Sequence, residues 1–116
     1  MIYEMHLKKR YFDLILRGSK KIEGRIVKPS RRGMKRGDEI IFIEEETGRR
    51  MRCIVKRVSF YETIESMVAT EGYKNLIPDA QDEEEVIEIY RGFYGDSKGF
   101  MAIELERCEL IRFLYF

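Results

Sequence analysis

The sequence predicts a mixed α+β protein whose sheet curls into a barrel with flanking helices. Segments that alternate apolar and polar residues, as half-buried strands do, are interspersed with segments whose apolar residues recur at helical spacing. In the long alternating segment 49–60, the apolar phase slips by one residue after Lys56-Arg57. Such a slip is typical of a β-bulge, and bulges let a sheet bend towards closure.

The first half of the chain is predicted to contain most of the strands. Tyr3, Met5 and Leu7 alternate with polar residues in the first of them, and Gly18 stops the helix that follows. Gly37-Asp38 marks a turn into an apolar strand that we expect to be central. The expected elements are a strand at 2–7, a helix at 9–16, an extended segment at 20–27, a short turn at 31–34, and strands at 39–45 and 49–60.

The second half is predicted to contain two helices and two strands. Asp82 and Glu85 have the spacing of a capping box, which explains the acidic run as a helix start. The expected elements are a helix at 63–71, a polar loop at 73–81 holding Pro78, a helix from 82 to about 93, a strand at 101–106 and a last strand at 108–116 that closes the sheet.

Composition favours one folded domain over residues 1–116. Hydrophobic residues make up 44% and charged residues 37% of the 116 positions, which predicts an ion-paired surface consistent with a thermophilic source. Neither a signal peptide nor an apolar run of roughly 20 residues is present, so we expect a cytoplasmic protein without membrane association. Cys53 and Cys108 are too few for a disulfide framework and are predicted to be reduced structural thiols.

The net charge of +1 conceals a polarised sequence. The charged residues in 17–36 are all basic except Glu23, whereas those in 79–88 are all acidic. A basic block beside a glycine-bounded turn is typical of phosphate binding, and the alternative is a solvated surface whose two poles partly pair. Within this block, the expected phosphate ligands are Lys20, Lys21 and Arg25 in the stretch 18–25 and, beyond it, Arg31, Arg32, Lys35 and Arg36, for which the alternative is a solvated turn.

The candidate site is the stretch 18–25, where the predicted helix ends and charged residues follow in an extended segment. Arg25 can form a planar fork on a phosphate or hold the Glu23 carboxylate, and Lys20 offers a mobile point charge. Glu23 can accept hydrogen bonds from a base amino group or orient the cations around it. The alternative is an ordinary ion-pair cluster. His6 is expected to be structural, and Tyr94 either stacks on a base or packs beside Phe93.

Motifs of the common enzyme chemistries are absent from the sequence. We find no phosphate-binding P-loop, dinucleotide fingerprint, nucleophile elbow or metal-binding cluster of histidine and cysteine. We therefore expect neither a cofactor nor a bound metal.

The stretch Gly18-Ser19-Lys20-Lys21-Ile22-Glu23-Gly24-Arg25 resembles the G-x-K-x-x-E-x-R motif of ASCH domains. The resemblance extends to Gly37-Asp38, to Phe60-Tyr61, to Phe93-Tyr94 and to the apolar strand 100–105. It implies a PUA-like β-barrel with helices at one side and a cleft, lined by the motif, that is thought to bind RNA.

Three classes of function follow. The first is an RNA-binding or nucleotide-binding domain with a basic cleft around Lys20, Glu23 and Arg25. The second comes from small ASCH members that hydrolyse acetylated cytidine with a lysine, a threonine and a later glutamate. Lys20 fits the lysine position and Glu71 is the candidate for the later glutamate, but Glu23 stands where the threonine would be. The route that stays chemically open uses water, with Glu23 as general base and Lys20 steadying the oxyanion. The third is a protein-interaction module that uses the acidic helix start at 82–88.

Overall fold

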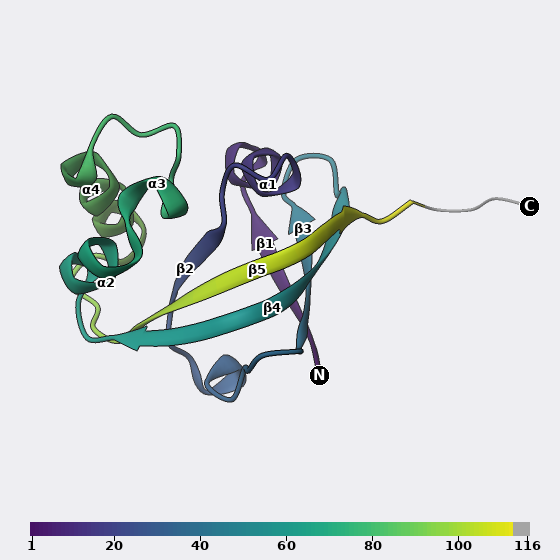
Figure 1. The fold of residues 1–116 in the computed structure, drawn as a ribbon, viewed down its shortest axis with the longest axis horizontal. Coiled ribbons are helices and arrows are strands. Elements are labelled where there is room, and N and C mark those ends of the chain that lie inside the picture. The colour runs from purple at the N-terminus through teal and green to yellow at the C-terminus, as the bar shows by residue number, and fades with distance from the viewer. Residues whose placement is uncertain (113–116) are drawn as a thin grey trace, which may run out of the picture.

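The computed structural model describes residues 1–112, which form a mixed five-stranded sheet with helices beside it (Figure 1). The strands are β1 (Ile2–Leu7), β2 (Ile22–Ile26), β3 (Glu39–Glu44), β4 (Arg50–Tyr61) and β5 (Phe100–Leu110). The helices are α1 (Lys9–Leu16), α2 (Ile64–Glu71), α3 (Tyr73–Leu76) and α4 (Glu83–Tyr94), with a 3-10 turn η1 at Pro29–Arg31.

The sheet has the strand order β1-β3-β4-β5-β2, so β1 and β2 are its two edges. β1 runs parallel to β3, and the other neighbours are antiparallel. The long strands β4 and β5 cross the molecule, while α2, α3 and α4 gather at one side and α1 lies apart from them (Figure 1). The mixed half-barrel with flanking helices confirms the predicted α+β class.

A bulge bends β4 where the apolar phase slips in the sequence. Val55 pairs with Leu105 and Arg57 pairs with Glu104, which leaves Lys56 without an opposite residue. The extra residue explains why the apolar residues of this strand change from odd positions (Met51, Cys53 and Val55) to even positions (Val58 and Phe60). The predicted bulge is therefore confirmed.

The prediction of two reduced thiols is wrong, because Cys53 and Cys108 form a disulfide. A second register shift lies between Arg52 and Ile54 of β4, and Arg107 opposite it has a φ of 51°, in the left-handed region. This irregularity brings Cys108 of β5 beside Cys53 of β4 although 55 positions separate them in sequence. The sequence spacing could not reveal this pairing, since it depends on the register of two long strands.

Two predicted segments differ in the structure. The segment 73–81 is not only a loop, because its first residues form the short helix α3. The strands expected at 101–106 and from 108 onwards are one continuous strand, β5, because the chain passes position 107 in a bulge instead of a turn. The rest of the predicted closing strand, 113–116, lies outside the described residues.

Side-chain caps begin the two longer helices of the second half. The Thr63 side chain accepts a hydrogen bond from the Ser66 amide at the start of α2, and Asp82 accepts one from the Glu85 amide at the start of α4. The acidic first turn of α4 thus has the structural role predicted for it. In the part of the chain that the structure describes, no helix is long and apolar enough to cross a membrane.

The core lies between the sheet and the helices that cover it. Its largest fully buried aliphatic and aromatic side chains come from β3, β4 and β5, from α1, α2 and α3, and from the residue that follows α3: they are Phe12, Ile40, Phe42, Met51, Val55, Met67, Leu76, Ile77, Phe100, Met101 and Ile103. This interior fixes the two edge strands relative to each other.

Candidate functional site

The candidate site is a cavity of about 240 Å³ between the edge strands β1 and β2, closed on one side by α4. α1 ends before Gly18, whose φ of 82° lets the chain reverse into β2. The motif residues then follow along β2. The cavity is lined by His6, Leu7, Lys8, Tyr11, Lys20, Glu23, Gly24, Arg25, Glu45, Ile77, Tyr90, Phe93 and Tyr94.

Three charged side chains of the motif form a buried ion-pair cluster at this cavity. The Lys20 ammonium lies 3.2 Å from Glu23 Oε1, and Arg25 Nε donates to Glu23 Oε2 at 2.6 Å. The side chains of Lys20 and Glu23 are 1% and 8% exposed, and that of Arg25 is 16% exposed. The cluster carries one net positive charge, and Arg25 is its most accessible member.

Lys20 is not the mobile point charge that the sequence suggests. Its Nζ donates to the backbone carbonyls of Ile22, at 2.6 Å, and Leu76, at 2.5 Å, in addition to facing Glu23. An ammonium has three hydrogens, and these three oxygens engage all of them. Lys20 therefore holds α3 against β2 and has no hydrogen left for a ligand.

Burial and charge act in opposite directions on this cluster. Burial lowers the pKa of Lys20 from its usual value, and the Glu23 carboxylate only partly offsets that effect. Burial alone would raise the pKa of Glu23, but the charges of Arg25 and Lys20 and their hydrogen bonds hold that pKa below its usual range. Glu23 is thus an ionised acceptor and a weak base.

Arg25 joins the two edge strands of the sheet. Its Nη2 donates to the backbone carbonyl of His6 on β1 at 2.6 Å, while its Nε remains on Glu23. Within residues 1–112, Arg25 Nη1 has no hydrogen-bond partner. Arg25 lines the cavity, so its guanidinium is one of the groups that a ligand there would meet.

Aromatic rings form the wall opposite the ion pairs. Tyr90 and Tyr94 of α4 stack with ring centroids 6.4 Å apart, and Phe93 meets Tyr11 of α1 edge to face at 6.2 Å. Burial raises the pKa of both α4 tyrosines, so their hydroxyls stay neutral. The cavity is thus lined by aromatic rings as well as by the charged side chains of Glu23 and Arg25.

Gly24 allows α4 to approach β2 this closely. A Cβ at this position would lie 2.8 Å from the Tyr90 hydroxyl and 3.0 Å from Met67 Cε. Both side chains are buried, so they have little room to move. A glycine at position 24, between Glu23 and Arg25, is therefore required by the contact between the strand and the aromatic wall.

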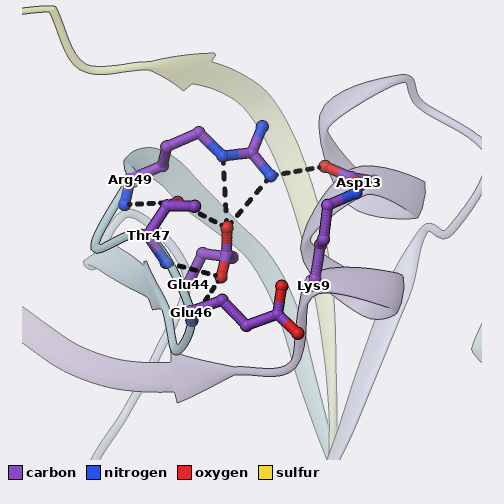
Figure 2. Close-up of polar contacts among 6 residues, drawn as sticks. All are labelled: Lys9, Asp13, Glu44, Glu46, Thr47 and Arg49. Carbon is purple, nitrogen blue, oxygen red and sulfur yellow. Dashed lines mark hydrogen bonds and ion pairs between the residues drawn. The ribbon is translucent and has the colours of Figure 1, made fainter.

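A polar cluster around Glu44 holds the loop that carries Glu45 to the cavity (Figure 2). The fully buried Glu44 carboxylate accepts hydrogen bonds from the Thr47 hydroxyl at 2.6 Å and from the amides of Glu46 and Thr47. Arg49 bridges Glu44 to Asp13 of α1. Hydrogen bonds led by that of the Thr47 hydroxyl lower the pKa of Glu44 to about 2.

The predicted site residues fall into two groups. Lys20, Glu23, Arg25 and Tyr94 converge on the cavity, whereas Lys21, Arg31, Arg32 and Glu71 are not among its lining residues. Arg31 donates to the Ile26 carbonyl from Nε and Nη2, and Lys21 and Arg32 are exposed. The lining carries Lys8, Lys20 and Arg25 against Glu23 and Glu45, so within the described residues the cavity is close to balanced in charge.

Glu71 belongs to a separate cluster. Both of its oxygens accept hydrogen bonds from Arg57, at 3.0 and 2.7 Å, and Tyr61 also donates to it. The structure therefore does not bring Glu71 to Lys20 and Glu23, contrary to the arrangement that the hydrolase interpretation requires. In residues 1–112 no group of histidine, cysteine, aspartate and glutamate is arranged to hold a metal ion.

Sequence reasoning missed Tyr11, Tyr90 and Glu45 as site residues. Tyr11 and Tyr90 sit at helical spacing among apolar residues, which the sequence presents as core positions. Only the packing of α1 and α4 across β2 turns their rings towards the motif. Glu45 carries no signal of its own, because its position depends on the Glu44 cluster.

The sheet and the cavity at its open seam define a mixed half-barrel with flanking helices. Its structure is similar to that of the S128A mutant of the ASCH protein from Zymomonas mobilis, with a TM-score of 0.72 and 13% identity over 94% of this chain and 70% of that one. At that identity the likeness concerns the fold alone. The family model of the ASCH domain matches residues 5–108, and the chain belongs to the ASCH domain family.

Two solved structures are similar to this chain in sequence as well. Hypothetical protein PH0355 is 38% identical, covering 96% of this chain and all of that one, with a TM-score of 0.81. Protein PF0455 from Pyrococcus furiosus is 36% identical, covering 91% of this chain and 96% of that one, with a TM-score of 0.69. No curated protein matches the sequence significantly.

Proposed function

We propose that this ASCH protein binds RNA, or a nucleotide-like ligand, by placing a base in the cavity around Glu23 and Arg25. The observation that carries the proposal is the juxtaposition of an ionised, immobilised carboxylate, a guanidinium with a free donor and a wall of aromatic rings. Single-stranded nucleic acids are recognised by stacking on aromatic rings and by hydrogen bonds to base edges.

Each group has a role in this proposal. Glu23 accepts hydrogen bonds from an amino or imino group of the base, using lone pairs that Lys20 and Arg25 leave free. Arg25 Nη1 donates to a carbonyl or phosphate oxygen. Tyr94, which lines the cavity and is half-buried, stacks on the base. The volume of about 240 Å³ suits one base and excludes a duplex.

The test is a titration of single-stranded RNA and mononucleotides at low salt with matched variants. Arg25→Gln should weaken binding of both ligands, whereas Lys21→Gln, which removes a charge from an exposed residue just before β2, should preserve mononucleotide binding. If Arg25→Gln and Tyr94→Ala bind RNA as the parent does, the cavity is not the binding site.

The geometry gives less support to hydrolysis of a modified nucleoside. A general base needs a pKa near the working pH, but the pKa of Glu23 is lowered and both of its oxygens already accept hydrogen bonds. Glu71 is outside the cavity. Release of acetate from acetylated cytidine that stops in Glu23→Gln would establish the hydrolase instead.

A further inference from the structure

A second concave surface lies away from the motif, between the turn before β3 and the bulged part of β4. This groove has a volume of about 550 Å³, and its lining includes Lys35, Arg36, Lys56, Arg57, Phe60 and Glu104. None of these residues lines the cavity around Glu23. The groove therefore needs an explanation of its own.

The bulge in β4 produces the charge arrangement of this groove. In a regular strand, adjacent side chains point to opposite faces. Here Lys56 and Arg57 both reach Glu104, with Lys56 Nζ at 3.7 Å and Arg57 Nε at 2.9 Å. The extra residue thus brings two adjacent cations to one carboxylate, and one acid faces several bases along the groove.

The walls of the groove are fixed. Asp38, which is 4% exposed, accepts a hydrogen bond from the Lys35 amide at 3.0 Å and one from the N-terminal ammonium at 3.1 Å. Gly37 and Asp38 also exchange backbone hydrogen bonds with Val55 of β4. Arg57 is held by Glu71 and Glu104, so the turn and the strand form a rigid surface.

Phe60 is an exposed aromatic ring in this basic setting. It is 53% exposed, although it lies on the strand that forms the centre of the sheet. The side chains of Lys35 and Lys56 are 77% and 54% exposed, and Arg36 is exposed as well. Lys35 Nζ lies 3.9 Å from Asp38 Oδ1 and Lys56 Nζ lies 3.7 Å from Glu104 Oε2, both at the long end of ion pairing. An exposed ring flanked by exposed cations is the combination with which proteins bind single-stranded nucleic acids.

We propose that this groove binds a stretch of single-stranded RNA, with a base stacked on Phe60 and the phosphates held by Lys35, Arg36 and Lys56. The inference rests on the proposed function, since the RNA strand whose base enters the cavity would extend to the groove. In this proposal the groove binds the part of the RNA strand outside the cavity, and the cavity selects the base.

The experiment compares labelled single-stranded RNAs of about 4 and about 16 nucleotides, a range that covers the site sizes of such surfaces. Phe60→Ala should weaken binding of the long RNA by roughly 5- to 100-fold and leave the short RNA unaffected. Arg36→Gln should lower the slope of log affinity against log salt by about 0.7 for the long RNA.

Matched controls separate stacking and phosphate contacts from general effects. Ile2→Ala removes another exposed apolar side chain, and Arg50→Gln removes a charge at the other end of β4; both should bind like the parent. Heparin offers charge without bases, so Phe60→Ala should leave heparin affinity unchanged. Thermal unfolding of each variant verifies that it is folded.

The outcomes distinguish this proposal from the proposed function. If Phe60→Ala and Arg36→Gln bind both RNAs like the parent while Arg25→Gln does not, the groove proposal is overturned and the cavity proposal stands. If Phe60→Ala and Arg36→Gln lose affinity for the long RNA while Arg25→Gln binds like the parent, the cavity proposal is overturned and the groove alone accounts for RNA binding. If the parent binds neither RNA, or binds the long one no better than heparin, the groove does not take RNA.

Discussion

Replacement of Lys20 by methionine tests the structural role of the motif lysine. Methionine fills a similar volume but donates no hydrogen bond, so the buried carbonyls of Ile22 and Leu76 lose their partner. Each buried polar group left unpaired costs about 1–3 kcal/mol, which gives a loss of about 2–6 kcal/mol. A domain of this size has a total stability of about 5–15 kcal/mol, so the loss should be a large fraction of the free energy of unfolding.

Urea and thermal unfolding followed by circular dichroism measure this loss. A loss of that size should lower the melting temperature by roughly 8–25 °C. Lys21→Met is the control, because its side chain is exposed and its replacement should change the free energy of unfolding by less than about 0.5 kcal/mol. A Lys20→Met protein within about 1 kcal/mol of the parent would show that the lysine is not held by these carbonyls.

Other predictions concern Gly24, the Glu44 cluster and the disulfide. Gly24→Ala places a Cβ 2.8 Å from the Tyr90 hydroxyl and should destabilise the fold by about 1–3 kcal/mol. Thermal unfolding should show that the double variant Gly24→Ala/Tyr90→Phe recovers part of that stability, because the hydroxyl is removed. Because the pKa of Glu44 falls from 4.5 to about 2, its ionised form stabilises the fold above pH 4.5, and that stabilisation is lost as the pH falls towards 2. Glu44→Gln should therefore be less stable than the parent at about pH 7, with the difference narrowing in acid; a constant difference would contradict the assignment. Reduction of the disulfide between Cys53 and Cys108, 55 positions apart, should lower the free energy of unfolding by about 4 kcal/mol, and unchanged unfolding in dithiothreitol would refute this.

Local signals in the sequence were sufficient for much of the fold. The bulge after Val55 follows from one slipped alternation, and the start of α4 follows from the spacing of Asp82 and Glu85, because both features depend on neighbouring residues. The reversal at Gly18 and the extended motif after it were predictable for the same reason. These features therefore required no knowledge of tertiary contacts.

The chemistry of the site depends on contacts that no local pattern contains. Lys20 is neutralised by Glu23 three positions away, but its third hydrogen bond goes to Leu76, 56 positions along the chain. Glu71 has a plausible sequence position for catalysis, yet Arg57 engages both of its oxygens elsewhere. A motif thus predicts which residues are charged and close, whereas packing decides which of them remains available to a ligand.

The position of the cavity follows from the way the sheet stays open. A closed barrel would pair the facing edges of β1 and β2 by backbone hydrogen bonds, but here side chains take that role. Lys20 and Arg31 donate to the carbonyls of Ile22 and Ile26 on the free edge of β2, while Arg25 donates across the seam to His6. Because side-chain hydrogen bonds take the place of backbone pairing at these edges, the seam can hold a cavity instead of a strand pair. The residues of the motif therefore line the cavity at the seam, and Arg25 both lines it and bridges it.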